Sequence, residues 1–240
     1  VVRVFSFNVD SIQKKYNIYC EIGSRNGDSL SLSKSPSIAI DPYFQLEKNP
    51  IGDKEFCLLF QQTSDYFFQN SIYRLPHLKC ELGFIDGMHL FENALKDFLN
   101  LAKISSDKSL LLVHDVLPWT VEMASRDYKS IPKGFPWTGD VWKLILILIN
   151  EGLKENMNIL SSAPSGLLAI YNPCKKIISK IEKNFEKICT HWLNIDLDNT
   201  KIEEIYNSDI FINEENLLQE LEKQKFGDII DQSSKTWVSH

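Results

Sequence analysis

The sequence predicts an α/β protein built on a mostly parallel sheet, and two observations support this fold class. Over the first ~170 residues, short β-rich runs alternate with amphipathic helical patterns. Each of these runs also ends in polar residues, and parallel sheets gather polar side chains at the carboxyl ends of their strands. The five strands predicted in this way are Ile18–Ile22, Ser37–Ile40, Phe56–Gln61, Cys80–Ile85 and Ser109–His114.

Two helices are predicted between the strands. Segment 89–103 carries its apolar residues on one face, at spacings of i, i+4, i+5, i+8 and i+11. These residues are Leu90, Ala94, Leu95, Phe98 and Leu101. Segment 140–153 is apolar on most sides, which predicts a more deeply buried helix.

A hairpin and a helical region complete the predicted fold. Two β-like runs, 156–163 and 166–172, flank Pro164-Ser165-Gly166, which is a turn signal and predicts an antiparallel hairpin. From Pro173 onward the pattern is helical, rich in Lys and Glu, and without strands. We therefore predict a main domain over residues 1–172 and a helical C-terminal appendage over residues 173–240.

Composition excludes some classes of function. The 240 residues carry a formal charge of -6, which offers no basic surface for nucleic acid. The longest apolar run, Leu144–Ile149, is far shorter than the ~20 residues of a membrane span, so we expect a soluble protein. Five cysteines without a C-x-x-C pair, three of them in predicted core strands, favour a reducing, cytoplasmic location.

The stretch IYCEIGSRNGDSL, Ile18 to Leu30, is a strand followed by a glycine turn and a helix start. Gly23 lets the chain turn sharply, and Gly27 lets the backbone approach a ligand. The dinucleotide fingerprint G-x-G-x-x-G is absent. A buried Glu21 suits a cationic ligand such as S-adenosylmethionine, which carries an ammonium and a sulfonium. The alternative is a plain strand-to-helix turn with a salt-bridged Glu21.

The next two strand ends are compatible with an adenosine ligand. Asp41 follows the first turn by nearly twenty residues, where an acidic side chain hydrogen-bonds the ribose hydroxyls of NAD or S-adenosylmethionine. Gln62, Thr63 and Ser64 are placed to contact the adenine edge. The alternative for Thr63 or Ser64 is a helix N-cap, which is compatible with the first interpretation.

Two acid–imidazole pairs end the remaining strands. Asp86 and Gly87 are followed by His89 at a helix start, and His114 and Asp115 end the next strand. Such a group either binds a divalent metal or forms a base with an orienting carboxylate. In the second case, a histidine near its ordinary pKa of ~6.5 is the natural base. The alternative is that these residues are structural.

Three motifs occur in order: E-I-G-x-x-x-G-x-S at 21–29, I-D-G-x-H-x-[FY]-E-x-x-x-x-D at 85–97, and an apolar strand ending in H-D at 110–115. In this combination the sequence resembles class I S-adenosylmethionine-dependent methyltransferases, in the small-molecule O-methyltransferase-like branch (methyltransferase family 24-like). The resemblance covers roughly residues 18–171 and leaves the C-terminal segment outside.

The resemblance implies a Rossmann-like, seven-stranded sheet with a C-terminal antiparallel hairpin, and S-adenosylmethionine as cofactor. It places the methionyl group near Glu21 and Gly23, with Asp86 beside the methionine end, the ribose on Asp41, and the adenine near Thr63 and Ser64. The full set of expected cofactor-binding residues is Glu21, Gly23, Ser24, Arg25, Gly27, Asp41, Thr63, Ser64, Asp86 and Gly87.

Some relatives hold a magnesium ion at the positions of Asp86 and Asp115. This sequence has Met88 and Val116 where those relatives supply oxygen ligands, which argues against metal dependence. The residues expected to act in catalysis are His89, His114 and Asp115.

The segment from Leu117 to Trp142 is rich in Trp, Pro and Gly. Its four prominent aromatic residues are expected to form an acceptor pocket or lid, or alternatively a surface loop packed by its own rings. They are Trp119, Tyr128, Phe135 and Trp137. Arg126 or Lys133 is placed to meet an anionic group, and Asp140 is expected to cap the helix that follows.

The leading hypothesis is methyl transfer from S-adenosylmethionine to an oxygen nucleophile of a small molecule, such as a sugar or a secondary metabolite. A nicotinamide-dependent oxidoreductase is disfavoured by the absent third glycine and the lack of a Tyr-x-x-x-Lys pair. The third possibility is a catalytically degenerate methyltransferase-like binding domain. The expected partners are a small-molecule acceptor and a second copy bound through the C-terminal helices, with no nucleic acid and no membrane.

Overall fold

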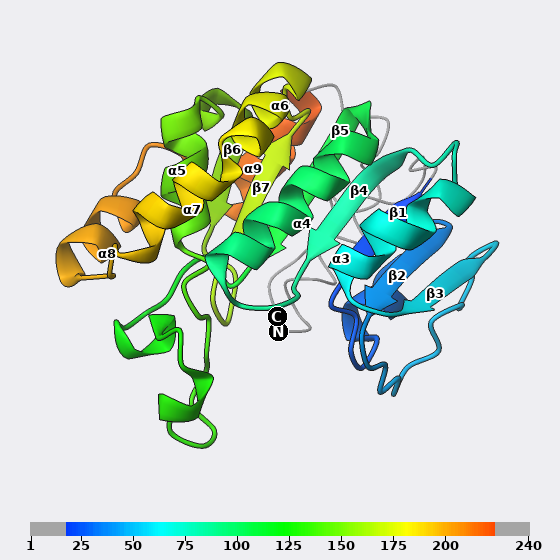
Figure 1. The fold of residues 1–240 in the computed structure, drawn as a ribbon, viewed down its shortest axis with the longest axis horizontal. Helices are drawn as coiled ribbons and strands as arrows, with labels where there is room; N and C mark the ends of the chain where they lie inside the picture. Colours follow the sequence, from blue (N-terminus) through cyan, green and yellow to red (C-terminus); the bar gives the residue numbers. More distant parts are fainter. Residues whose placement is uncertain (1–17, 224–240) are drawn as a thin grey trace.

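The computed structural model describes residues 18–223, which form an eight-stranded sheet flanked by helices (Figure 1). The strands are β1 (Tyr19–Ile22), β2 (Ser37–Asp41), β3 (Cys57–Gln61), β4 (Cys80–Ile85), β5 (Ser105–His114), β6 (Met157–Leu160), β7 (Leu167–Tyr171) and β8 (Phe211–Ile212). The α-helices are α2 (Asp28–Leu32), α3 (Ser64–Tyr66), α4 (Phe91–Ile104), α5 (Lys143–Glu151), α6 (Lys175–Lys183), α7 (Phe185–Leu193), α8 (Asn199–Tyr206) and α9 (Glu214–Lys223).

The strand order is β3-β2-β1-β4-β5-β7-β6-β8, and only β7 runs antiparallel to its two neighbours. This order confirms the mostly parallel, Rossmann-like sheet with an antiparallel hairpin. One expectation was wrong: the region after residue 173 contributes a strand, β8, which pairs in parallel with β6. Two residues are too few to show a strand pattern in the sequence, so this pairing depends on tertiary packing.

The central strands are buried on both faces, as parallel strands between layers must be. Every residue of β1, β2 and β7 is buried, whereas the edge strand β3 is half exposed. Helix α4 packs against the sheet through the apolar stripe that its sequence predicts, including Leu95, Phe98 and Leu101. Helix α5 buries most of its side chains in the same core.

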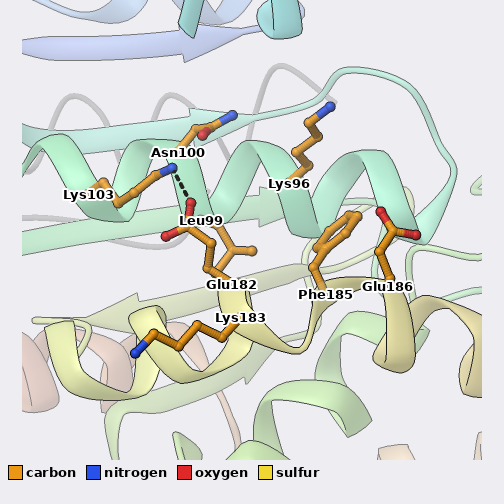
Figure 2. Close-up of a pocket in the computed structure, with 8 residues that line it drawn as sticks. All are labelled: Lys96, Leu99, Asn100, Lys103, Glu182, Lys183, Phe185 and Glu186. Atoms are coloured by element: carbon orange, nitrogen blue, oxygen red, sulfur yellow. Dashed lines mark hydrogen bonds and ion pairs between the residues drawn. The ribbon is translucent and has the colours of Figure 1, made fainter. Parts of the chain in front are cut away.

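The C-terminal helices share this core. Ile178, Ile181, Ile188 and Trp192 belong to the same hydrophobic cluster as α4 and α5, and α6 and α7 lie alongside α4 (Figure 1). A groove of about 300 Å³ marks the seam between α4 and the α6–α7 pair, where the Lys103 ammonium pairs with Glu182 at 2.8 Å (Figure 2). The domain boundary at residue 172 stays a prediction.

Within residues 18–223, none of the helices has the length and apolar character that crossing a bilayer requires.

Candidate functional site

The chain reverses its direction across the sheet between β1 and β4, which lie side by side at its centre. From β1 the order proceeds outward to β2 and β3, and from β4 outward to β5. In open α/β sheets, the crevice at the carboxyl ends of such strands is where ligands bind. The turn after β1 and the residues that follow β4 and β5 meet at this point.

The glycine turn after β1 is shaped by backbone packing. Gly23 adopts φ = 90°, and an added Cβ would lie 2.0 Å from the carbonyl oxygen of Asp86. Only a glycine therefore lets the β1 turn pass the β4 turn at this distance. A Cβ added on Gly27 would lie 2.9 Å from Leu46 Cδ2, so a side chain here would clash with Leu46. The expectation that Gly27 lets the backbone approach a ligand stays a prediction.

Glu21 lies beneath this turn, completely buried. Its carboxyl oxygens accept hydrogen bonds from the hydroxyls of Tyr19, at 2.5 Å, and Ser29, at 2.9 Å. Burial raises the pKa of Glu21 to about 7, although both hydroxyls favour the ionised form. The side chain thus links β1 to the start of α2 through Ser29. Its partners are hydroxyls and not the cation that the salt-bridge alternative requires.

Asp41 connects the loops after β1 and β2. Its Oδ2 accepts from the Arg25 backbone N–H at 2.9 Å, and its Oδ1 accepts from the Tyr43 N–H at 2.7 Å. Each carboxylate oxygen has a second lone pair, so the side chain can still accept hydrogen bonds from a ligand. Ser24 is buried in the same turn, and Arg25 adopts φ = 36°.

The residues after β3 show the N-cap role considered for them, and the adenine contact stays a prediction. The Thr63 hydroxyl accepts from the Tyr66 N–H at 3.2 Å, which confirms the N-cap interpretation for Thr63. Gln62 accepts at Oε1 from the Ser71 hydroxyl at 3.3 Å. Its buried Nε2 has no hydrogen-bond partner among the residues described, so one amide donor is left for a ligand.

Asp97 is a residue that the sequence analysis did not select. It lies on the buried face of α4, near the Ser64 side chain, and its Oδ2 would lie 3.4 Å from a Cβ added on Gly87. Burial raises the pKa of Asp97 to about 7. The carboxyl therefore connects the start of α3 to the turn after β4. Asp97 is the last residue of the second motif, and this position could have marked it as a site residue.

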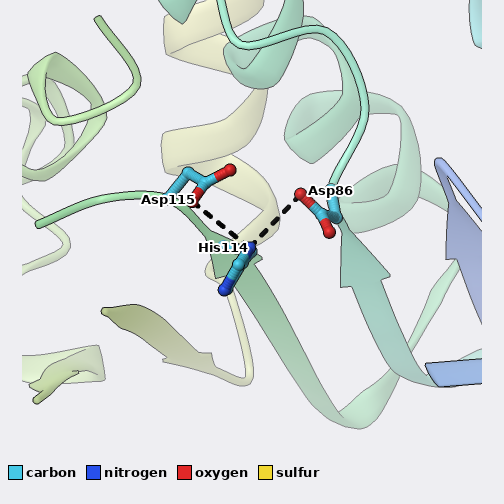
Figure 3. A group of neighbouring side chains, drawn as sticks. All are labelled: Asp86, His114 and Asp115. Carbon is cyan, nitrogen blue, oxygen red and sulfur yellow. Dashed lines mark hydrogen bonds and ion pairs between the residues drawn. The ribbon is translucent and has the colours of Figure 1, made fainter. Parts of the chain in front are cut away.

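The two acid–imidazole pairs converge, as the strand adjacency predicted. His114 lies between the two carboxylates, with Nδ1 at 3.3 Å from Asp86 Oδ1 and 3.5 Å from Asp115 Oδ1 (Figure 3). His89 approaches from the start of α4, with Nε2 at 3.0 Å from Asp115 Oδ2 and 3.5 Å from Asp86 Oδ1. We call these four residues the acid–imidazole cluster.

The surroundings of both imidazoles of the cluster favour the protonated form. His89 has the Trp137 carbonyl 2.9 Å from Nδ1 and Asp115 beside Nε2, so acceptors face both of its ring nitrogens. Burial alone would lower the pKa of His89, but Asp86 and Asp115 raise it overall. The same balance raises the pKa of His114 to about 10. Both shifts argue against a histidine base near its ordinary pKa.

A metal ion could draw ligands from the same place. Asp86, His114 and Asp115 each offer a ligand atom within 4.8 Å of the others. The neighbouring positions add no oxygen ligand, because Met88 is exposed and Val116 is buried in the core. Metal binding would displace the proton that His114 shares with the two carboxylates.

The segment 117–142 projects beyond the sheet (Figure 1, green) and its last residues dock on the cluster. The Trp137 ring stacks on His89 with centroids 5.0 Å apart, and an added Cβ on Gly139 would lie 1.7 Å from the His89 carbonyl oxygen. The Tyr128 ring packs on Trp137 with centroids 5.6 Å apart, and Tyr128, Trp119 and Phe135 are all exposed.

Two expectations for this segment were wrong. Asp140 caps α4, because its Oδ1 accepts from the Phe91 N–H at 2.9 Å, and not the helix that follows it. The Arg126 guanidinium forms two hydrogen bonds with Glu92 and also pairs with Asp140. Its donors are therefore used within the protein, and not by an anionic group of an acceptor. Lys143, almost fully buried, completes the network with Nζ at 2.9 Å from Asp140 Oδ2.

No protein-family model and no curated protein matches this chain. Among solved structures, it is similar to the O-methyltransferase TomG from Streptomyces achromogenes, involved in tomaymycin synthesis and solved in complex with SAM. That match has a TM-score of 0.50 and 11% identity, and covers 71% of this chain and 78% of the other. An O-methyltransferase from Bacillus cereus, solved with SAH, matches at a TM-score of 0.50 and 12% identity, over 71% of this chain and 80% of the other. The chain therefore has the fold of class I S-adenosylmethionine-dependent methyltransferases.

Proposed function

We propose that this protein transfers the methyl group of S-adenosylmethionine to an oxygen nucleophile of a small molecule. The observation that carries this proposal is the acid–imidazole cluster at the ends of β4 and β5, immediately beside the glycine turn after β1. In a methyltransferase fold, this arrangement brings groups that handle a hydroxyl proton next to the turn expected to hold the cofactor.

The residues present fit this cofactor. Gln62 has an unpaired amide donor for the adenine, and Asp41 retains lone pairs for the ribose hydroxyls. The turn from Gly23 to Gly27 would hold the methionyl part, supported from below by Glu21. When bound, S-adenosylmethionine supplies a methyl group made electrophilic by the sulfonium.

Asp115 is the group in the cluster best suited to accept the acceptor's hydroxyl proton. The neighbouring carboxylates raise the pKa of both imidazoles and so favour their protonated form, which leaves the carboxylates as proton acceptors. Asp86 is a poor base, because the hydrogen bond and charge of His114 hold its pKa well below the usual value despite its burial. The imidazolium of His89 would then stabilise negative charge that develops on the acceptor oxygen.

The proposed reaction is metal-independent. His89 and His114 lie against the two carboxylates of the cluster. Protonated imidazoles there would supply the positive charge that an ion supplies in magnesium-dependent relatives. Chelator should then leave turnover unchanged. A loss of turnover that is restored by Mg²⁺ would assign Asp86 and Asp115 as metal ligands instead.

Parallel calorimetric titrations with S-adenosylmethionine, S-adenosylhomocysteine and NAD test the cofactor. We expect both adenosyl compounds to bind and NAD to bind more weakly. NAD binding tighter than S-adenosylhomocysteine would reject the proposal in favour of an oxidoreductase. Transfer of labelled methyl to a panel of phenols, sugars and other alcohols then tests the reaction. Binding without transfer to any acceptor would favour a degenerate binding domain.

A further inference from the structure

The turn between β6 and β7 is joined to the chain that follows β5. The Leu117 N–H donates to the Ser165 carbonyl at 2.7 Å, and the Gly166 N–H closes the turn on the Ser162 carbonyl at 2.7 Å. Gly166 adopts φ = 75°, and an added Cβ would lie 2.4 Å from the Leu117 side chain. The hairpin turn is therefore held against the residues next to Asp115.

The Ser165 side chain makes a direct contact with the acid–imidazole cluster. Its hydroxyl donates a hydrogen bond to Asp115 Oδ1, and the two residues are only 1% and 6% exposed. Asp115 adopts φ = 62°, a left-handed conformation that is uncommon for a residue with a Cβ. Such a conformation persists where the surroundings hold it in place.

The two oxygens of Asp115 are thus divided between different partners. Oδ1 accepts from Ser165 and also lies 3.5 Å from His114 Nδ1, whereas Oδ2 faces His89 Nε2 at 3.0 Å. Without the serine hydroxyl, Oδ1 would lack this donor, and the carboxylate would be free to turn towards His114. His89 would then lose its acceptor.

We propose that Ser165 is a positioning residue that fixes the orientation of the Asp115 carboxylate towards His89. Its catalytic meaning rests on the proposed function, in which Asp115 receives the hydroxyl proton. The sequence marks Ser165 only as part of a turn. Its contact with Asp115 joins positions fifty residues apart and depends on the pairing of β7 with β5.

The orientation can be tested without an acceptor, by measuring the exchange of the two imidazole N–H protons of His89 with water by NMR. Ser165→Ala should speed exchange at Nε2 at least about tenfold, while Nδ1, held by the Trp137 carbonyl, serves as an internal control for folding. Ser165→Thr should restore slow exchange. Ser162→Ala, in the same turn, should change neither proton.

Unchanged Nε2 exchange in a folded Ser165→Ala protein would overturn the proposal. If that variant does not fold, the same measurement on Ser165→Cys decides, because the thiol keeps the shape and weakens the donor. Faster Nε2 exchange supports the positioning role, and wild-type exchange rejects it.

A second arm separates this inference from the proposed function. Ser165→Ala should bind S-adenosylhomocysteine within about twofold of the wild type, since Asp115 is not assigned to the cofactor. Its kcat should fall about ten- to a hundredfold on any hydroxyl acceptor that the wild type methylates. Unchanged kcat would reject the positioning role. If the wild type binds no S-adenosylhomocysteine, the proposed function fails, while the exchange measurement still tests the orientation of Asp115.

Discussion

Asp140 should be one of the most sensitive positions for stability, because three groups depend on its carboxylate. It caps α4 through the Phe91 N–H, and it pairs with the buried ammonium of Lys143 and with Arg126. Asp140→Ala removes a cap, which costs ~1 kcal/mol. It also leaves Lys143 as a buried, uncompensated charge, which costs roughly 3–5 kcal/mol. Arg126 is partly exposed and keeps Glu92, so it adds little.

The expected loss is therefore about 4–6 kcal/mol of the free energy of unfolding, measured by urea denaturation and followed by tryptophan fluorescence. Asp140→Asn serves as the matched control, since it keeps an oxygen for the Phe91 N–H and removes only the charge. Adding Lys143→Met to Asp140→Asn should recover most of the loss, because it removes the stranded ammonium. A loss below about 1 kcal/mol for Asp140→Ala, or no recovery in the double variant, would refute this reasoning.

Three further outcomes follow from the turn after β1. Gly23→Ala should lower the melting temperature even without cofactor, because the new Cβ would lie 2.0 Å from the Asp86 carbonyl oxygen; an unchanged melting temperature would contradict this packing. Glu21 holds its proton to a pH of about 7 in the folded state, while the unfolded chain ionises near ~4.5. Ionisation of Glu21 should therefore lower the free energy of unfolding by about 3 kcal/mol as the pH rises from 4.5 to above 7, and urea denaturation of Glu21→Gln should lack this contribution. Asp41→Ala should weaken S-adenosylhomocysteine binding about tenfold or more in calorimetric titration, through lost ribose contacts and the release of the Arg25 N–H, and wild-type affinity would exclude the ribose assignment.

Most of the sheet could be predicted because its strands are short, apolar and followed by polar residues. β4 was predicted with the bounds it has in the structure, and the other parallel strands within a few residues. β8 could not be, because Phe211–Ile212 is ordered by its pairing with β6 and not by a local pattern. The participation of the C-terminal helices in the core was missed for a similar reason, since amphipathic helices do not reveal what they pack against.

The convergence of the cluster was predictable, because adjacent parallel strands bring their carboxyl ends to the same edge of the sheet. The second acceptor of His89, the Trp137 carbonyl, was not, because Trp137 lies 48 residues away in the sequence. The helix capped by Asp140 and the partner of Ser165 were hidden in the same way. Single motifs name the residues of a site, whereas long-range contacts set their charge states and orientations.

The pairing of β8 with β6 has a consequence for how the chain is made. The outer edge of β6 lacks its partner until residues 211–212 have left the ribosome, and the side of α4 that α6 covers stays bare until Lys175–Lys183 has done so. An unpaired strand edge beside uncovered apolar surface is the combination that promotes association between nascent chains. Residues 173–212 therefore protect the sheet and α4, and a chain that stops soon after residue 172 would be prone to aggregate.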